Sequence, residues 1–147
     1  MTTVGIISDT HGLLREEALA ALAGVDLILH GGDIGPPEII ERLSEIAPVH
    51  AVLGNVDKGD WLPTMRTIDI ESVRVLLLHD ISSFRSTDGV RVVVFGHSHK
   101  PLVEERGGVL LVNPGSAGPR RFKLPVTVAR MRVDGAQVSA EVSKIVD

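Results

Sequence analysis

The fold of this chain is decided by the stretch VGIISDTHG at residues 4–12, in which an apolar run leads into two polar side chains. Residues 4–8 form a nearly continuous apolar segment, which is typical of a strand buried on both faces of a parallel sheet. Asp9 and His11 follow this strand directly. Open α/β sheets carry their binding sites at the carboxyl ends of their strands. The stretch therefore predicts a central strand and one corner of a functional site.

The next part of the chain repeats this alternation of strand and helix. The apolar spacing predicts helices over residues 13–22 and from residue 36 onward, and strands over residues 26–30 and 49–53. Three strand–helix units of this length favour a parallel sheet with right-handed crossovers. We therefore expect an α/β fold.

The second half of the chain is rich in hairpin signals and is predicted to be more antiparallel. Gly107-Gly108 and Asp134-Gly135 separate apolar runs at the spacing of two-residue hairpin loops. No disordered linker divides the chain, so residues 1–147 are expected to form one domain. The strands predicted here cover residues 65–70, 73–78, 91–95, 103–106, 109–112, 126–133 and 137–146.

The composition excludes several classes of protein. The 147 residues include no cysteine, which excludes disulfides and thiolate metal sites. A formal net charge of −4 argues against a general nucleic-acid binder, which usually carries a basic face. No apolar run reaches the roughly 18–20 residues of a membrane span, and the N-terminus lacks the basic segment of a signal peptide. We therefore expect a cytoplasmic protein.

Seven potential metal ligands follow the predicted strands in short clusters. Two pairs have the same spacing, Asp9 with His11 and His97 with His99. Residues i and i+2 of an extended backbone point to the same side, so each pair is expected to converge on one ion. Each motif alone is weak evidence, and an isolated strand-end histidine such as His79 is more often a buried core residue. The candidates are Asp9, His11, Asp33, Asn55, His79, His97 and His99.

The donor types indicate which metals the site would hold. Carboxylate, amide oxygen and imidazole without thiolate suit Mn²⁺, Fe or Zn²⁺ better than Ca²⁺ or Cu⁺. Seven donors are too many for one open catalytic site, but they suit two ions about 3.5–4 Å apart that share a bridging carboxylate. Such a pair stays net positive after two carboxylates and a hydroxide are counted, which favours the binding of a phosphate.

The same clusters carry a family resemblance. Together they resemble the motifs of the calcineurin-like metallophosphoesterases, in particular those of the family's small bacterial and archaeal phosphodiesterases. The resemblance runs from residue 4 to about residue 119. The matching motifs are Asp9-X-His11, Gly32-Asp33, Gly54-Asn55-X-Asp57, the strand-end His79, Gly96-His97-X-His99 and Asn113-Pro114-Gly115-Ser116.

The resemblance implies a fold and a chemistry. The fold would be a four-layer αββα sandwich with mixed sheets and a dinuclear site at its upper edge. The ions would be Mn²⁺ most often, and otherwise Fe, Ni²⁺, Co²⁺ or Zn²⁺. A hydroxide bridging them would attack phosphorus in line, with catalytic roles for Asp9, Asp33, Asn55 and His97. One ion would be held by Asp9, His11, Asp33 and His99, and the other by Asp33, Asn55, His79 and His97.

Three departures from the family pattern bear on the activity. Val56 stands where many members have a histidine that acts as a general acid, so diesters or esters with good leaving groups should react better than alkyl monoesters. Asp80 stands where glycine is usual, and three interpretations stay open: it orients His79, it places negative charge near the phosphate, or it begins a surface loop. The interval from His79 to Arg91 is so short that the usual helix is expected to be short or missing.

The function that these features favour is that of a metal-dependent phosphodiesterase, a hydrolase acting on a small phosphoester. One alternative is a catalytically weak protein-binding scaffold, the role that the eukaryotic retromer scaffold subunit gives to this fold. Another is a nuclease, which the small size and acidic charge disfavour. A homo-oligomer, dimer or tetramer, would fit the apolar hairpins. The basic residues Arg120, Arg121 and Lys123 are interpreted as a solvated loop in preference to a phosphate contact.

Overall fold

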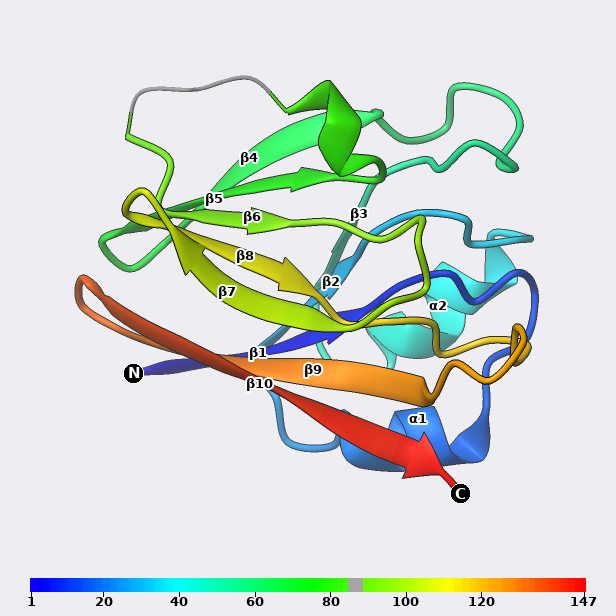
Figure 1. Ribbon diagram of the computed structural model, residues 1–147. Helices are drawn as coiled ribbons and strands as arrows, with labels where there is room; N and C mark the ends of the chain where they lie inside the picture. Colours follow the sequence, from blue (N-terminus) through cyan, green and yellow to red (C-terminus); the bar gives the residue numbers. More distant parts are fainter. Residues whose placement is uncertain (85–88) are drawn as a thin grey trace.

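The computed structural model describes residues 1–84 and 89–147, and shows two five-stranded sheets packed face to face. Figure 1 shows the helices α1 (Glu16–Ala21) and α2 (Glu38–Ser44) on the outer side of the sheet that contains β1 (Thr2–Ile7). The sandwich expected from the sequence is confirmed. No helix in this described part of the chain is long and apolar enough to cross a membrane.

The first sheet is built around the N-terminal strand. Its strands β1, β2 and β3 are parallel, and α1 and α2 form the crossovers between them. The C-terminal hairpin adds to its other side, where β9 pairs antiparallel with β1 in a register that sets Ile6 opposite Ala129. In spatial order the strands are β10 (Gln137–Val146), β9 (Val126–Asp134), β1, β2 (Leu27–His30) and β3 (Val49–Ala51).

The second sheet is formed by the middle of the chain. Its three inner strands are parallel, and each of its two edge strands pairs antiparallel with its neighbour. In spatial order the strands are β4 (Met65–Ile70), β5 (Val73–Leu78), β6 (Val92–Val94), β8 (Val109–Asn113) and β7 (Leu102–Arg106). The second sheet therefore has a parallel centre and antiparallel edges, whereas the first has parallel strands on one side and antiparallel strands on the other.

The first half of the chain is parallel and the second half is more antiparallel, as expected, but the two halves do not form separate sheets. The hairpin β9–β10 joins the N-terminal sheet, and β5, β6 and β8 are parallel to one another. Hairpin signals identify strands that pair with their sequence neighbours, but they do not say which sheet the hairpin extends. The interval after β5 contains, among its described residues, a single 3-10 turn, η1 (Ile81–Ser83), as its short length predicted.

The buried apolar side chains of the described residues form three clusters, and two of them pack on β1. Val4 and Ile6 face the space between the sheets, together with Met131. Ile7 and Leu22 belong to the layer beneath the helices. Both faces of β1 are therefore buried, which accounts for its continuous apolar sequence, and each fully buried side chain contributes roughly 1.5–3 kcal/mol. The packing brings the carboxyl ends of β1, β6 and β8 to the same side of the molecule (Figure 1).

Candidate metal centre

The loops that follow the parallel strands bring the seven candidate ligands into one cluster. Asn55, which follows β3, has its amide beside His97. The other six form two groups, and within each group the ligand atoms lie within 4.8 Å of one another. The first group contains Asp9, His11 and His99, and the second contains Asp33, His79 and His97.

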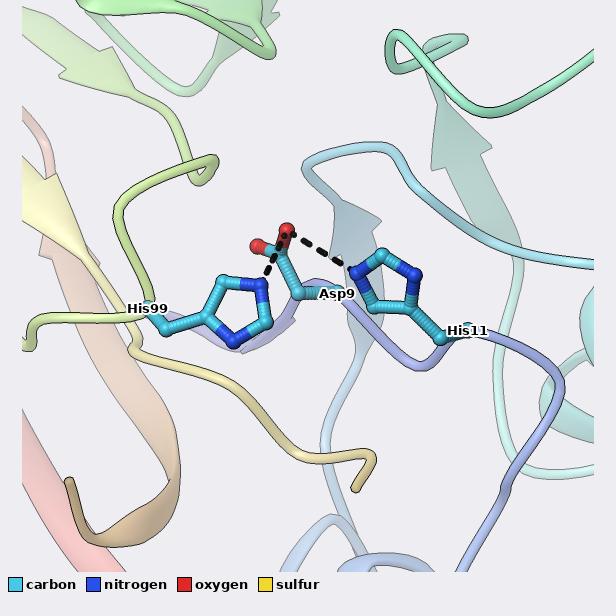
Figure 2. A group of neighbouring side chains, drawn as sticks. All are labelled: Asp9, His11 and His99. Carbon is cyan, nitrogen blue, oxygen red and sulfur yellow. Dashed lines mark ion pairs between the residues drawn. The ribbon is translucent and has the colours of Figure 1, made fainter. Parts of the chain in front are cut away.

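The first group is centred on the Asp9 carboxylate. Asp9 Oδ1 lies 3.3 Å from His99 Nε2 and 3.8 Å from His11 Nε2. Figure 2 shows the two imidazole rings on opposite sides of this oxygen, carried by different loops. Asp9 Oδ1 and His11 Nε2 are buried and have no hydrogen-bond partner among the described residues. Buried polar atoms almost always have a partner, so these two atoms fit a cation between them.

The second group is centred on Asp33. Asp33 Oδ2 lies 3.2 Å from His79 Nε2. Asn55 Oδ1 lies 3.3 Å from His97 Nδ1, 3.0 Å from His79 Nε2 and 3.3 Å from each Asp33 oxygen. All of these neighbouring atoms offer lone pairs. They therefore require either that the Asn55 amide is flipped, so that its N–H groups take this place and donate, or that a cation lies at their centre. The donor set, all oxygen and nitrogen, fits a divalent ion.

Asp33 connects the two groups. Its Oδ2 lies 3.5 Å from His11 Nε2 of the first group as well as 3.2 Å from His79 Nε2 of the second. Its other oxygen, Oδ1, accepts the Val56 N–H at 3.1 Å. A carboxylate held between two sets of donors has the position of a bridging ligand in a two-metal site.

The backbone is strained at the candidate ligands themselves. Asp9, His11, Asp33, His97 and His99 have φ angles between 46° and 74°, in the left-handed region that residues other than glycine rarely adopt. Such strain concentrates at functional sites. The expected convergence of His97 with His99 is wrong. Both residues lie beyond the end of β6, so the alternation of extended backbone does not apply, and they belong to different groups.

Glycines allow the ligand loops to touch. A Cβ added at Gly54 would overlap the Asp33 carboxylate, and one added at Gly96 would overlap Ser8 Oγ and crowd Asp9 Oδ2. Only glycine lets backbone approach a neighbouring group so closely. The glycines of the Gly54-Asn55 and Gly96-His97 motifs therefore bring each ligand loop against the carboxylate of another loop.

The charges of the cluster favour the protonation states of metal ligands at Asp33 and His99, whereas His79 is drawn towards its protonated form. Burial disfavours the Asp33 carboxylate, but hydrogen bonds from His79 and from the Val56 N–H outweigh it and lower the pKa of Asp33 to about 2. Burial also disfavours the His79 imidazolium, yet hydrogen bonds to Asp33 and the Gly31 carbonyl raise the pKa of His79. Burial lowers the pKa of His99 against the pull of Asp9, and the positive charge of Arg121 adds to this effect. An anionic Asp33 and a neutral His99 are both ready to bind a metal.

Neighbouring groups orient the ligands. His79 Nδ1 donates to the Gly31 carbonyl at 2.7 Å, so Nε2, which lies 3.2 Å from Asp33 Oδ2, is the nitrogen that would face a metal ion. Asp9 Oδ2 accepts from Ser8 Oγ at 2.6 Å and from the His97 N–H at 3.2 Å. These contacts leave Asp9 Oδ1 free to face the histidines of the first group.

Some supporting residues were identified by sequence reasoning without their roles. Asp57 accepts N–H groups from Ile34 and Gly54, at 2.9 Å each, and so ties the loop of Asp33 to the loop of Asn55. The Asn113–Ser116 motif supports the ligand loops: Asn113 Nδ2 donates to the Gly96 carbonyl and Ser116 Oγ donates to the Asp9 carbonyl, each at 3.1 Å. The motif was visible in the sequence, but its partners lie far away along the chain.

The two departures from the family motifs both lie at the cluster. The Val56 side chain is 50% exposed, and it carries no proton that it could transfer. Asp80 Oδ2 lies 4.0 Å from His97 Nε2, and Asp80 Oδ1 accepts the Ser82 N–H at the start of η1. Asp80 therefore begins a loop, and its carboxylate also lies near the candidate ligand His97.

Comparison with known proteins points to one family. Residues 2–136 match the calcineurin-like phosphoesterase superfamily domain. The chain is 36% identical to a probable metallophosphoesterase of Methanothermobacter thermautotrophicus, with 95% of this chain and 90% of that protein covered. It is 29% identical to the phosphodiesterase YfcE of Escherichia coli, with 90% of this chain and 89% of that protein covered.

Solved structures share the fold. Vacuolar protein sorting 29 of Cryptosporidium parvum matches with a TM-score of 0.85 at 22% identity, covering 99% of this chain and 92% of that chain. The phosphoesterase YfcE of E. coli matches with a TM-score of 0.74 at 25% identity, covering 97% and 99% of the two chains. With a family domain that spans nearly the whole sequence and donors gathered at the strand ends, the chain belongs to the calcineurin-like phosphoesterase superfamily and is a metal-dependent phosphoesterase.

Proposed function

We propose that this protein is a phosphodiesterase that works with two divalent ions. The observation that carries the proposal is the position of Asp33 Oδ2, which lies 3.5 Å from His11 Nε2 and 3.2 Å from His79 Nε2. A site for one ion would need only one of the two groups of donors. Two groups on either side of one carboxylate support a pair of ions that share it.

Each group offers a donor set suited to one ion. The mixture of carboxylate, amide and imidazole donors favours Mn²⁺, with Fe, Ni²⁺, Co²⁺ or Zn²⁺ as alternatives. When bound, the ions would polarise the phosphoryl oxygens and supply the nucleophile at neutral pH. Asp9, His11, Asp33 and His99 would hold one ion, and Asp33, Asn55, His79 and His97 would hold the other.

The chain itself would set the charge and the direction of approach. Asp9 and Asp33 bring two negative charges against the four positive charges of two divalent ions, so the site would attract a phosphate. The Asp9 side chain is fully buried, whereas the His97 side chain is 46% exposed. A small phosphoester would therefore approach from the side of His97 and the exposed Asn55.

Val56 supports a preference for diesters. Its backbone N–H holds Asp33 Oδ1, but its side chain has no proton for a leaving alcohol. Without such an acid, an ester whose leaving group is stable as an anion should react faster than an alkyl monoester. Bis-p-nitrophenyl phosphate should accordingly turn over faster than glycerol phosphate. The reverse order would refute the preference.

Hydrolysis of bis-p-nitrophenyl phosphate tests the proposal. Activity should require Mn²⁺ and disappear with a chelator, and Asp33→Asn should reduce it to the background rate because both ions lose their shared ligand. The matched control is Asp134→Asn, which removes an exposed carboxylate at the end of β9. The neighbouring Val133 pairs with Thr2, so Asp134 lies at the opposite end of β1 from the ligands. This variant should keep the wild-type rate. Metal analysis should find two ions per chain, and one ion would contradict the dinuclear proposal.

A protein-binding role is the competing proposal, because sorting proteins share the fold. A wild-type rate no higher than that of Asp33→Asn, with Mn²⁺ present, would favour it. A nuclease would show salt-dependent binding to DNA. Light scattering would decide whether the protein is the dimer or tetramer that the apolar hairpins led us to expect.

A further inference from the structure

A hollow of about 880 Å³ opens beside the candidate ligand His97. One of its walls is formed by His97, Ser98 and Lys100, and another by Arg121, Phe122 and Lys123. Three cationic side chains meet here on a chain whose formal net charge is −4. The local charge of the hollow is thus opposite to the charge of the whole protein. Of the basic residues interpreted from the sequence as a solvated loop, Arg121 and Lys123 line this hollow, whereas Arg120 donates to the Asp147 carbonyl.

The loop that carries Arg121, Phe122 and Lys123 is fixed at its base against the ligand loop of Asp9. Ser116 Oγ donates to the Asp9 carbonyl at 3.1 Å. A Cβ added at Gly118 would overlap the backbone oxygen of Thr10, so the two loops are in contact without a gap. The base of the loop is therefore fixed relative to the metal centre.

Phe122 has an unusual conformation and exposure. Its side chain is 89% exposed, and its φ of 55° lies in the left-handed region, which is strained for a bulky residue. Packing does not account for this strain, because the ring is not buried. Strained residues cluster at active sites and ligand clamps. Phe122 therefore presents an aromatic face at the hollow and has the features of a ligand contact.

His97 separates this hollow from a second one. The second hollow, of about 430 Å³, is lined by Asn55, His79 and Asp80 as well as by His97. A phosphodiester has two ester groups, and a phosphate held at the metal centre would direct one of them to each side of His97. Asp80 would repel an anionic group on its side, whereas Lys100 and its neighbours would attract one. An anionic ester group is therefore directed to the basic hollow.

We propose that the basic hollow is a subsite for a nucleotide, the half of a diester that carries an aromatic base and a second anionic group. Phe122 would stack on the base, as aromatic side chains do with any of the bases. Arg121 and the two lysines would pair with the second phosphate. This inference rests on the proposed phosphodiesterase function and names its substrate class. An acidic peptide would use the cations but not the exposed aromatic face.

Isothermal titration calorimetry on the Mn²⁺-loaded protein tests the subsite without requiring turnover. The probes are adenosine 5′-monophosphate and ribose 5-phosphate, which differ only in the base. The wild type should bind the nucleotide roughly tenfold more tightly, the gain expected from one base–aromatic stack. Phe122→Ala should abolish this difference, whereas Phe122→Trp should preserve it because the indole ring also stacks.

The proposed binding of a second phosphate by the cationic side chains of the hollow is tested with adenosine 3′,5′-bisphosphate. Lys123→Ala should weaken its binding more than that of adenosine 5′-monophosphate, and added salt should reduce this effect. The matched control is Lys144→Ala, an exposed lysine on β10, which should leave both affinities unchanged.

The outcomes separate the two proposals. Equal affinity of the wild type for the two monophosphates, or an undiminished preference in Phe122→Ala, would overturn the nucleotide subsite. Failure of the phosphodiesterase proposal shows instead as absence of hydrolysis by the wild type. Calorimetry measures the affinity of the subsite for the probes whether or not the protein hydrolyses a diester.

Discussion

The ionisation of His30, beneath the ligand loops, is expected to control the stability of the protein in acid. Its ring is fully buried, with Nδ1 3.1 Å from the Gly32 nitrogen and Nε2 3.1 Å from Thr10 Oγ1. The Gly32 N–H can only donate, so Nδ1 accepts and the ring proton lies on Nε2. The Thr10 hydroxyl accepts that proton and donates to the Ile34 carbonyl at 2.7 Å. A second proton on Nδ1 would face the Gly32 N–H, so the folded protein requires neutral His30.

The size of the effect follows from the pKa. Burial lowers the pKa of His30 from 6.5 to about 3. The unfolded chain binds a proton at His30 as the pH falls below about 6.5, whereas the folded chain does not until about pH 3. Stability is lost across this window because the unfolded state binds more protons. At about pH 4.5, two units below the unfolded value, the loss is about 2.7 kcal/mol, at about 1.36 kcal/mol for each unit.

Urea unfolding of the wild type and of His30→Asn measures this loss. Asparagine offers an acceptor to the Gly32 N–H and does not titrate. Between about pH 7.5 and 4.5, the free energy of unfolding of the wild type should fall by about 2.7 kcal/mol relative to the variant. The matched control is His50→Asn, because His50 is only partly buried and its pKa is lowered by burial and by Arg66; it should show a smaller change. The same difference between wild type and His30→Asn at both pH values would refute the reasoning.

Three further changes test the ligand loops. Gly96→Ala should weaken Mn²⁺ binding at least roughly tenfold in a calorimetric titration, because its methyl group would displace Asp9 Oδ2; wild-type affinity would show that the loops do not touch. Asp57→Asn should lower the free energy of unfolding by roughly 2 kcal/mol in urea, because the carboxylate accepts N–H groups from two ligand loops; a change below about 0.5 kcal/mol would contradict this role. Asp80→Asn should weaken Mn²⁺ binding by no more than about fivefold, because its pair with His97 is half exposed and 4.0 Å long; a loss of about a hundredfold would instead make Asp80 essential to the site.

The strands and the candidate ligands could be predicted from the sequence because both depend on local signals. A strand buried on both faces, such as β1, must be apolar throughout, and the first polar residues after it mark its carboxyl end. Glycine-rich turns at Gly107-Gly108 and Asp134-Gly135 identified the pairs β7–β8 and β9–β10. Asp9 and His97 could therefore be placed at strand ends without knowledge of the sheets.

The arrangement of the ligands depends on contacts between distant parts of the chain, which local signals do not contain. His97 and His99 belong to different groups, and the contact that fixes the His97 backbone, from its N–H to Asp9 Oδ2, joins residues far apart in the sequence. The position of the basic loop could not be predicted for the same reason. Its place beside His97 follows from the packing of Gly118 against Thr10, which no spacing in the sequence reveals.

The strain in the ligand loops favours metal-dependent catalysis over a purely structural use of this fold. A residue other than glycine in the left-handed region costs roughly 1 kcal/mol, so strain at several ligands is a sizeable part of a net stability of roughly 5–15 kcal/mol. Glycine at these positions would relieve the strain and keep the sandwich, and a scaffold that binds proteins elsewhere would lose nothing by it. Aspartate and histidine are favoured at these positions only if bringing their side chains together at one point lowers the free energy enough to offset the strain. Binding of a cation would supply this favourable free energy. It would give a partner to Asp9 Oδ1 and His11 Nε2, which are buried and have no hydrogen bonds to the described residues.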